Sequence, residues 1–213
     1  GMGLGYATAN RGACHINAGY LVFFERLAPV NIDPYTKSAK PAFTIFQQNV
    51  LDAVSAAGNC IFTTYAVVPP AAFKVAPYSM TAKMISKVMG ASGPLMDHSM
   101  GLMRKTPMNV TAMIPHSEVI EKLTGMKMTL GKFLAAGERV FNLERLYNLR
   151  EGITGASDRL PDRLAKVSQE GRPKARVPMD ELLPHYYRVR GWNGEGVPRK
   201  STLRQLGMEE YAV

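Results

Sequence analysis

The strongest constraint on the fold of this chain is a long amphipathic stretch at residues 129–151. Its apolar side chains recur at spacings of three and four residues, which is the period of an α-helix. They are Leu130, Phe133, Leu134, Phe141, Leu146 and Leu149, with Gly137 in the same stripe. The pattern leaves Glu138, Arg145 and Glu151 for the solvent face, with Thr129 as N-cap and Gly152 as stop signal. A helix of about 23 residues is about 34 Å long and crosses a whole domain.

Shorter helical patterns surround this stretch. They predict helices at 41–57, 80–89, 117–124, 178–190 and 201–206. Convincing alternation of apolar and polar residues, the signature of strands, is absent. The predicted fold class is therefore all-α and multihelical.

The remaining segments read as connections. Residues 1–38 predict a loop-rich part with one short helix or strand, 61–78 a buried connector, and 155–178 a polar loop. We interpret the methionines of 90–115 as core, because Met fills irregular gaps. We expect one domain over 1–213, whose helical body is 39–213.

The charge of the chain is basic but evenly distributed. Lys and Arg number 26 against 17 Asp and Glu, a net charge of +9. Basic residues between 139 and 204 are interleaved with acidic ones, and no recognition-helix or RNA-binding signature is present. We therefore expect no nucleic-acid partner.

Targeting signals and cysteine usage indicate the compartment. No apolar run reaches the roughly 18 residues of a spanning helix, so we expect no membrane association. Gly1 and Met2 read as an expression remnant with no signal peptide after them. Two cysteines in a chain of this length favour a reducing compartment, and we predict the cytoplasm.

Two loops carry the residues whose side chains are suited to catalysis or metal binding. Cys14 and His15 are adjacent, and His15 is either a proton-transfer or ligand residue or a buried histidine bonded to backbone. Cys14 alone reads as a small buried hydrophobe. Cys60 follows the Gly58 turn at the end of a predicted helix, which makes it the better metal ligand. Two cysteines cannot complete an iron–sulfur cluster, which takes four thiolates.

Three separate motifs carry a resemblance to a known family. The run Ala7, Thr8, Arg11, Gly12 and His15 resembles the Ala-Thr-x-x-Arg-Gly-x-x-His loop of the tungsten-containing aldehyde ferredoxin oxidoreductases. Residues 137–152 are similar to the family's late helix. Residues 186–207, with Tyr186, Tyr187, Trp192 and Pro198, are similar to its C-terminus.

The resemblance implies the helical C-terminal part of an enzyme that oxidises aldehydes to carboxylates and reduces ferredoxin. It implies a tungsten or molybdenum bis-pterin cofactor beside a [4Fe-4S] cluster. Three cluster cysteines come from an earlier segment of the family's chain and the fourth from the helical part. We expect the N-terminal pterin-binding domain to be absent here, and this chain alone to hold no cofactor and to be inactive.

The family's functional residues carry over position by position. Cys60 resembles the fourth cluster ligand, and His15 the histidine for proton transfer near the metal. Arg11 matches a pterin-contacting position, and Asn17 stands where the family often has a basic pterin contact. The family's Asp-x-x-Gly-x-Cys pattern appears here with Ser55 for the aspartate. Asn59 precedes the cysteine as a further cofactor-binding candidate, and Asp52 is nearby but out of register.

Two functional hypotheses follow. In the first, a companion chain or N-terminal domain supplies the pterin site and three cysteines, and ferredoxin accepts the electrons. In the second, the chain is a non-catalytic remnant or interaction module that keeps the fold, as the serine at Ser55 suggests. Self-association into a homo-oligomer is compatible with either.

Overall fold

The computed structural model describes residues 1–18, 20–22, 25, 32–63, 74–76, 79–107, 115–168 and 175–212. Its elements in chain order are α1 (Met2–Thr8), α2 (Lys40–Ala56), α3 (Met80–Ala91), α4 (Gly93–Met103), α5 (Pro115–Thr124), α6 (Leu130–Arg150), η4 (Gly155–Ser157), α7 (Asp162–Lys166), α8 (Met179–Arg190), α9 (Lys200–Leu206) and η5 (Glu209–Tyr211). Over these ranges the chain forms no strand, and an antiparallel bridge joins Trp192 to Pro198. The predicted all-α class is confirmed.

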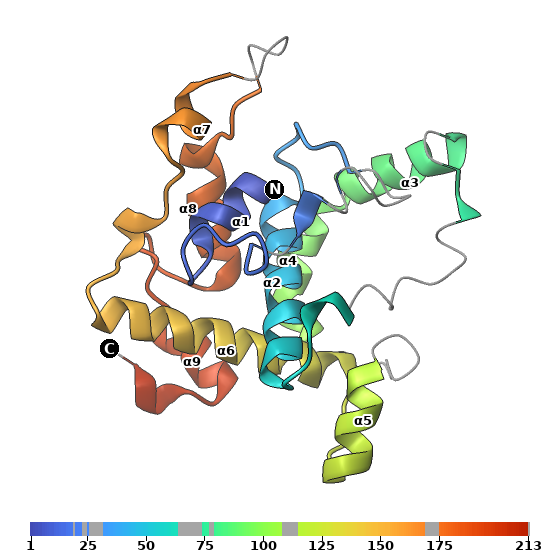
Figure 1. Ribbon diagram of the computed structural model, residues 1–213, viewed down its shortest axis with the longest axis vertical. Coiled ribbons are helices and arrows are strands. Elements are labelled where there is room, and N and C mark those ends of the chain that lie inside the picture. The colour runs from blue at the N-terminus through green and yellow to red at the C-terminus, as the bar shows by residue number, and fades with distance from the viewer. Residues whose placement is uncertain are drawn as a thin grey trace.

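Helices α2 and α6 form the centre of the fold. Figure 1 shows α2 descending through the middle of the body and α6 crossing it, with α8 alongside α1. Helices α3 and α5 extend outward from this centre. The long helix predicted at 129–151 is confirmed: Thr129 Oγ1 accepts a hydrogen bond from the Lys132 backbone N–H at 3.2 Å. Gly152 follows the helix with φ of 83°.

The crossing of α2 and α6 depends on a residue without a side chain. A Cβ on Gly137 would lie 1.7 Å from the carbonyl oxygen of Asn49 and 2.9 Å from the backbone nitrogen of Ala53. The two backbones therefore touch at this point, closer than any side chain would permit. Gly137 belongs to the apolar stripe of α6 because it faces α2.

Three helices are absent from the sequence prediction. α1 contains two glycines and α4 begins with Gly and Pro, which read as loop signals. α7 is a five-residue helix within the segment predicted as loop. Both longer helices form because their apolar faces reach the core, where Leu4 and Met100 are buried. The core interpretation holds for Met96, Met100 and Met103, whereas Met108 and Met113 lie outside the described residues. Most of the predicted connector at 61–78 lies outside the described residues.

An aromatic cluster attaches the C-terminal segment to the body. Tyr186, Tyr187 and Trp192 are buried with Phe141 and Leu4. The Trp192 ring stacks on Phe141 at a centroid distance of 6.0 Å, and its Nε1–H donates to Asn142 Oδ1 at 2.8 Å. Burial of the indole with its polar atom satisfied stabilises this attachment.

The prediction that Glu138 and Arg145 face solvent is wrong. Both are buried, because each has a charged partner inside the fold. Arg104 Nε lies 3.2 Å from Glu138 Oε2. The Arg145 guanidinium donates to both carboxylate oxygens of Asp158 at 2.9 Å. Paired charges of this kind are the ones that tolerate burial.

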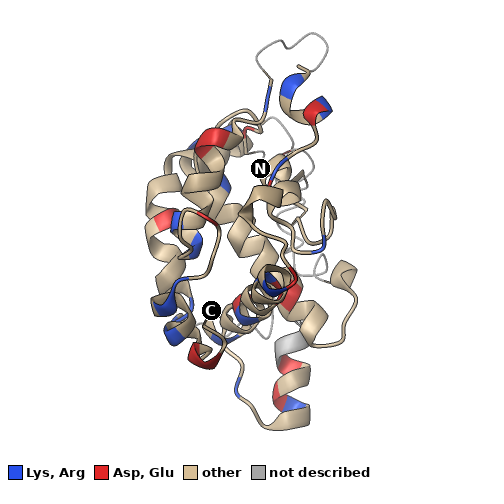
Figure 2. Ribbon diagram, turned by 90° about the vertical axis from the view of Figure 1, so that its left-hand side faces the viewer, with Lys and Arg blue, Asp and Glu red and all other residues tan. Residues whose placement is uncertain are grey.

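Figure 2 shows Lys and Arg positions interspersed with Asp and Glu positions along the ribbon of the described residues. None of the helices in the described ranges is long and apolar enough to cross a membrane. The absence of a nucleic-acid partner and the single-domain organisation stay predictions.

Replacement of Gly137 by alanine tests the helix crossing. We expect Gly137→Ala to lower the free energy of unfolding by about 1–3 kcal/mol or more, because the methyl group must push the two backbones apart. Thermal and urea unfolding followed by circular dichroism measure this change.

Gly90 in α3 is the matched control, since a Cβ there meets nothing within 4 Å. Gly90→Ala is expected to leave stability unchanged or to raise it by up to about 1 kcal/mol. Equal effects of the two substitutions would contradict the backbone contact at Gly137.

Candidate functional site

The loop after α1 presents the first group of candidate residues. It turns at Gly12, whose φ is 76° and whose N–H donates to the carbonyl of Ala9 at 3.0 Å. Arg11 and His15 are exposed on this loop, and Cys14 is half-buried. The interpretation of His15 as a buried histidine is therefore wrong. Its imidazole is available to a ligand or a second protein segment.

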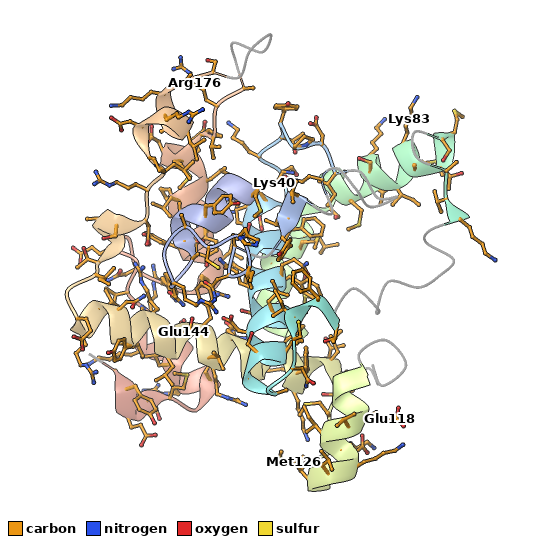
Figure 3. All side chains as sticks on the ribbon, in the orientation of Figure 1. Lys40, Lys83, Glu118, Met126, Glu144 and Arg176 are labelled. Atoms are coloured by element: carbon orange, nitrogen blue, oxygen red, sulfur yellow. The ribbon has the colours of Figure 1, made fainter. Side chains whose placement is uncertain are left out.

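Asparagine side chains attach this loop to α6. Asn10 Nδ2 donates to the carbonyl of Phe141 at 2.8 Å and to Glu144 Oε2 at 3.3 Å. Asn148 Nδ2 donates to the carbonyl of Asn10 at 2.7 Å. Glu144 points from α6 toward the loop in Figure 3. Arg11 thus follows a residue whose position is fixed by hydrogen bonds.

Asn17 lies inside this network. It is 3% exposed, its Oδ1 accepts from the backbone N–H of Asn10 at 2.9 Å, and its Nδ2 donates to Asp52 Oδ1 at 3.2 Å. Both ends of its amide are occupied by protein atoms. The geometry assigns Asn17 a supporting role in the loop, and its pterin contact stays a prediction.

Asp52 is a buried carboxyl group beneath the loop. It is 5% exposed, and its Oδ2 has no hydrogen-bond partner among the described residues. Burial, and secondarily the charge of Glu144, raise its pKa to about 8 against the opposing effects of Arg190 and Arg11. Asp52 is buried whereas Ser55 is exposed, so the two side chains do not share a surface.

Cys60 stands on a defined turn at the end of α2. Gly58 has φ of 73°, and its N–H donates to the carbonyl of Ser55 at 3.0 Å. The next N–H, of Asn59, donates to the carbonyl of Val54 at 3.2 Å. These two bonds form a Schellman motif, which ends the helix in a fixed geometry. Ser55, Asn59 and Cys60 are exposed around it.

One apolar cluster holds both loops. It consists of Leu51, Ala53, Val54, Ile61 and Phe133, with Ile16 and Tyr20 among the residues packed against it, and we call it the Phe133 cluster. Ile16 follows His15 and Ile61 follows Cys60, so each candidate residue precedes an anchor in the same cluster.

Two ring contacts reinforce this connection. The His15 and Tyr20 rings meet edge to face at a centroid distance of 5.4 Å, and Tyr20 meets Phe62 at 6.0 Å. The structure therefore brings the segments of His15 and Cys60 together. Tyr20 is not among the residues that the sequence pattern singled out, because its partner Phe62 is distant in the chain.

The donor set limits what this chain can hold. Nowhere in the described ranges do three His, Cys, Asp or Glu side chains gather at a metal-binding distance. Cys60 offers one exposed thiol, and Cys14 Sγ lies 4.0 Å from Arg11 Nη2. One exposed thiol is compatible with a single position of a four-thiolate cluster.

A cavity of about 920 Å³ opens on the other side of the Arg11 loop. It lies between that loop, the end of α6 and residues 153–162, and Arg11, Asn148 and Arg159 are among its lining residues. Its size is at the upper end of that found for small-molecule sites. Guanidinium groups in its wall suit an anionic ligand.

The sequence of the chain is similar to that of a known protein family. Residues 1–208 match the family described as aldehyde ferredoxin oxidoreductase, domains 2 and 3. The chain is 32% identical to the tungsten-containing aldehyde ferredoxin oxidoreductases of Pyrococcus horikoshii and Pyrococcus furiosus and 31% identical to that of Thermococcus kodakarensis. Each alignment covers 99% of this chain and 28% of the relative.

Asp52 makes stability depend on pH. Its ordinary pKa is 3.8, and the folded chain raises it to about 8. Between these values the folded state keeps a proton that the unfolded state releases. Its contribution to stability is therefore complete below about pH 4, declines by at most about 1.4 kcal/mol per pH unit, and is gone above pH 8.

Asp52→Asn is expected to remove this decline, since an amide oxygen can still accept the hydrogen bond of Asn17. Urea unfolding at pH 5 and pH 8 measures it: the variant gains stability relative to the parent chain as pH rises. Asp180→Asn, an exposed site on α8, is the control. An identical pH profile for Asp52→Asn and the parent chain would show that Asp52 is ionised in both states.

Proposed function

Because the chain belongs to the aldehyde ferredoxin oxidoreductase family, we propose that it forms the helical part of an enzyme oxidising aldehydes to carboxylates. The chain spans 28% of the length of the relatives it matches. Catalysis then needs a further segment, either in the same gene product or in a companion chain. That segment would supply the pterin-binding site and three cysteines.

The observation that carries this proposal is the common anchoring of Cys60 and His15. An exposed thiol on a Schellman turn suits an incomplete cluster, because the turn holds the sulfur at the surface for other ligands. In the proposed enzyme Cys60 is the fourth ligand of a [4Fe-4S] cluster. The cluster, when bound, supplies one-electron transfer toward ferredoxin.

His15 would act as the proton-transfer residue. Its imidazole is exposed, and imidazole is the side chain most often used in general acid–base catalysis. Contact with Tyr20 orients the ring, and Ile16 anchors its backbone. Its proposed task is to accept or release the proton that accompanies aldehyde oxidation at a tungsten or molybdenum pterin.

Arg11, Ser55 and Asn59 would contribute to holding the pterin. The Arg11 guanidinium is exposed at the cavity wall and can donate to phosphate or carbonyl oxygens. Ser55 and Asn59 are exposed beside Cys60 and offer neutral donors and acceptors. Asn17 would assist from below, by holding Asn10 and the loop of Arg11 in place. We propose a cytoplasmic location, consistent with two free thiols.

One observation favours the alternative of a non-catalytic relative. Ser55 replaces a carboxylate, and the nearest acid, Asp52, is directed into the fold. A charged contact to the pterin would then be missing. Under this alternative the chain would be an interaction module that binds neither tungsten nor molybdenum.

Metal analysis after anaerobic affinity purification from the native host distinguishes these functions. We expect the chain to co-purify with a segment rich in cysteine and with stoichiometric iron and tungsten or molybdenum. Cys60→Ser is expected to lose most of the iron, because one of four thiolates is gone. Cys14→Ser is the matched control and keeps it.

His15→Gln tests the proton-transfer role in the same complex. It is expected to keep the metals and to lose aldehyde oxidation by about 100-fold or more, the usual contribution of a positioned acid–base group. A chain that purifies alone and free of metal supports the interaction module instead. Full iron content in Cys60→Ser would refute the ligand role.

A further inference from the structure

We propose that Tyr20 is a positioning residue that fixes the His15 imidazole relative to the turn bearing Cys60. Its relevance to catalysis rests on the proposed function, whereas the placement itself is a property of this chain. Tyr20 would act through His15 and would not touch the substrate.

The contacts of Tyr20 span both candidate loops. On one side its ring meets the His15 ring at 80° between planes, and on the other it meets Phe62 at 63°. Phe62 is two residues after Cys60. A single side chain thus connects the candidate proton-transfer group to the segment of the candidate cluster ligand.

Edge contacts of this type restrict ring orientation. Aromatic pairs favour edge-to-face arrangements because the positive ring edge meets the negative ring face. His15 is exposed, so the contact with Tyr20 restrains a side chain that would otherwise sample several rotamers. The rotamer restraint is the proposed effect of Tyr20.

The backbone of Tyr20 supports a specialised role. Its φ is 49°, in the left-handed region that bulky side chains rarely adopt. Glycine or asparagine would be accommodated there with less strain. A tyrosine in this strained conformation is the pattern found where the surroundings require a particular side chain.

Burial and neighbouring groups keep the phenol neutral. Burial raises the pKa of the Tyr20 hydroxyl, and the proximity of Cys14 and Tyr6 raises it further. The ring is only partly buried at the edge of the Phe133 cluster. An aliphatic side chain could fill that edge, so apolar packing alone does not require an aromatic residue.

Nuclear magnetic resonance of the full chain tests the proposal without metal or cofactor. The ring proton signals of His15 and Phe62 report on the Tyr20 ring. The His15 signals are assigned by comparison with the His15→Gln variant. Tyr20→Phe is expected to leave both sets near their original positions. Tyr20→Leu and Tyr20→Asn are expected to move both, with His15 approaching the shifts of an unstructured histidine.

Tyr20→Asn separates the ring from the backbone, because asparagine suits the left-handed conformation but lacks the aromatic group. Tyr211→Leu, at an exposed tyrosine in η5, is the matched control and leaves His15 unchanged. Circular dichroism verifies that each variant is folded. A Tyr20→Leu variant too unstable to fold is set aside, and Tyr20→Asn decides.

Unchanged His15 signals in folded Tyr20→Asn or Tyr20→Leu would overturn the positioning role. Movement in Tyr20→Phe as large as in Tyr20→Leu would also overturn it, since the ring would then be insufficient. These readings are independent of metal content. Failure of the proposed function therefore leaves this test intact, and the reverse also holds.

Discussion

The crossing of α2 and α6 at Gly137 is the contact on which the rest of the fold depends. Because the backbones touch there, the residues one turn on either side enter different parts of the interior. Phe133 packs with Leu51 and Val54 beneath the candidate site. Phe141 packs with Tyr186 and Trp192 in the main core. The close approach of α2 and α6 at Gly137 thus connects the main core to the candidate site, and these two packed helices support the site.

Buried polar groups determine how the third helix joins this pair. Arg190 of α8 is 1% exposed, lies 3.6 Å from the Phe141 ring centroid, and donates to Asn49 Oδ1 at 2.5 Å. It has no direct carboxylate partner among the described residues, but it lowers the pKa of both Asp52 and Glu138 against their burial. Arg190 therefore connects α8 electrostatically to Asp52 of α2 and Glu138 of α6.

The sequence allowed prediction of those features that depend on local pattern. Helix periodicity and the stop at Gly58 predicted α2 and the position of Cys60 at its end. The failures concern partners distant in sequence. Arg145 is buried because Asp158 pairs with it, and His15 is exposed on a loop that the hydrogen bonds of Asn10 attach to α6. Neither relation can be predicted from the residue spacing of a single sequence. The contacts of Tyr20 with His15 and Phe62 were not predicted for the same reason.

The shared anchoring of Ile16 and Ile61 has a consequence for how such a site can diverge. Ile61 belongs to the Phe133 cluster and Ile16 packs against it, so a change of volume at Phe133 reaches the loops of both His15 and Cys60. The two loops therefore do not vary independently: a substitution in this one cluster alters the support of the imidazole and of the thiol together.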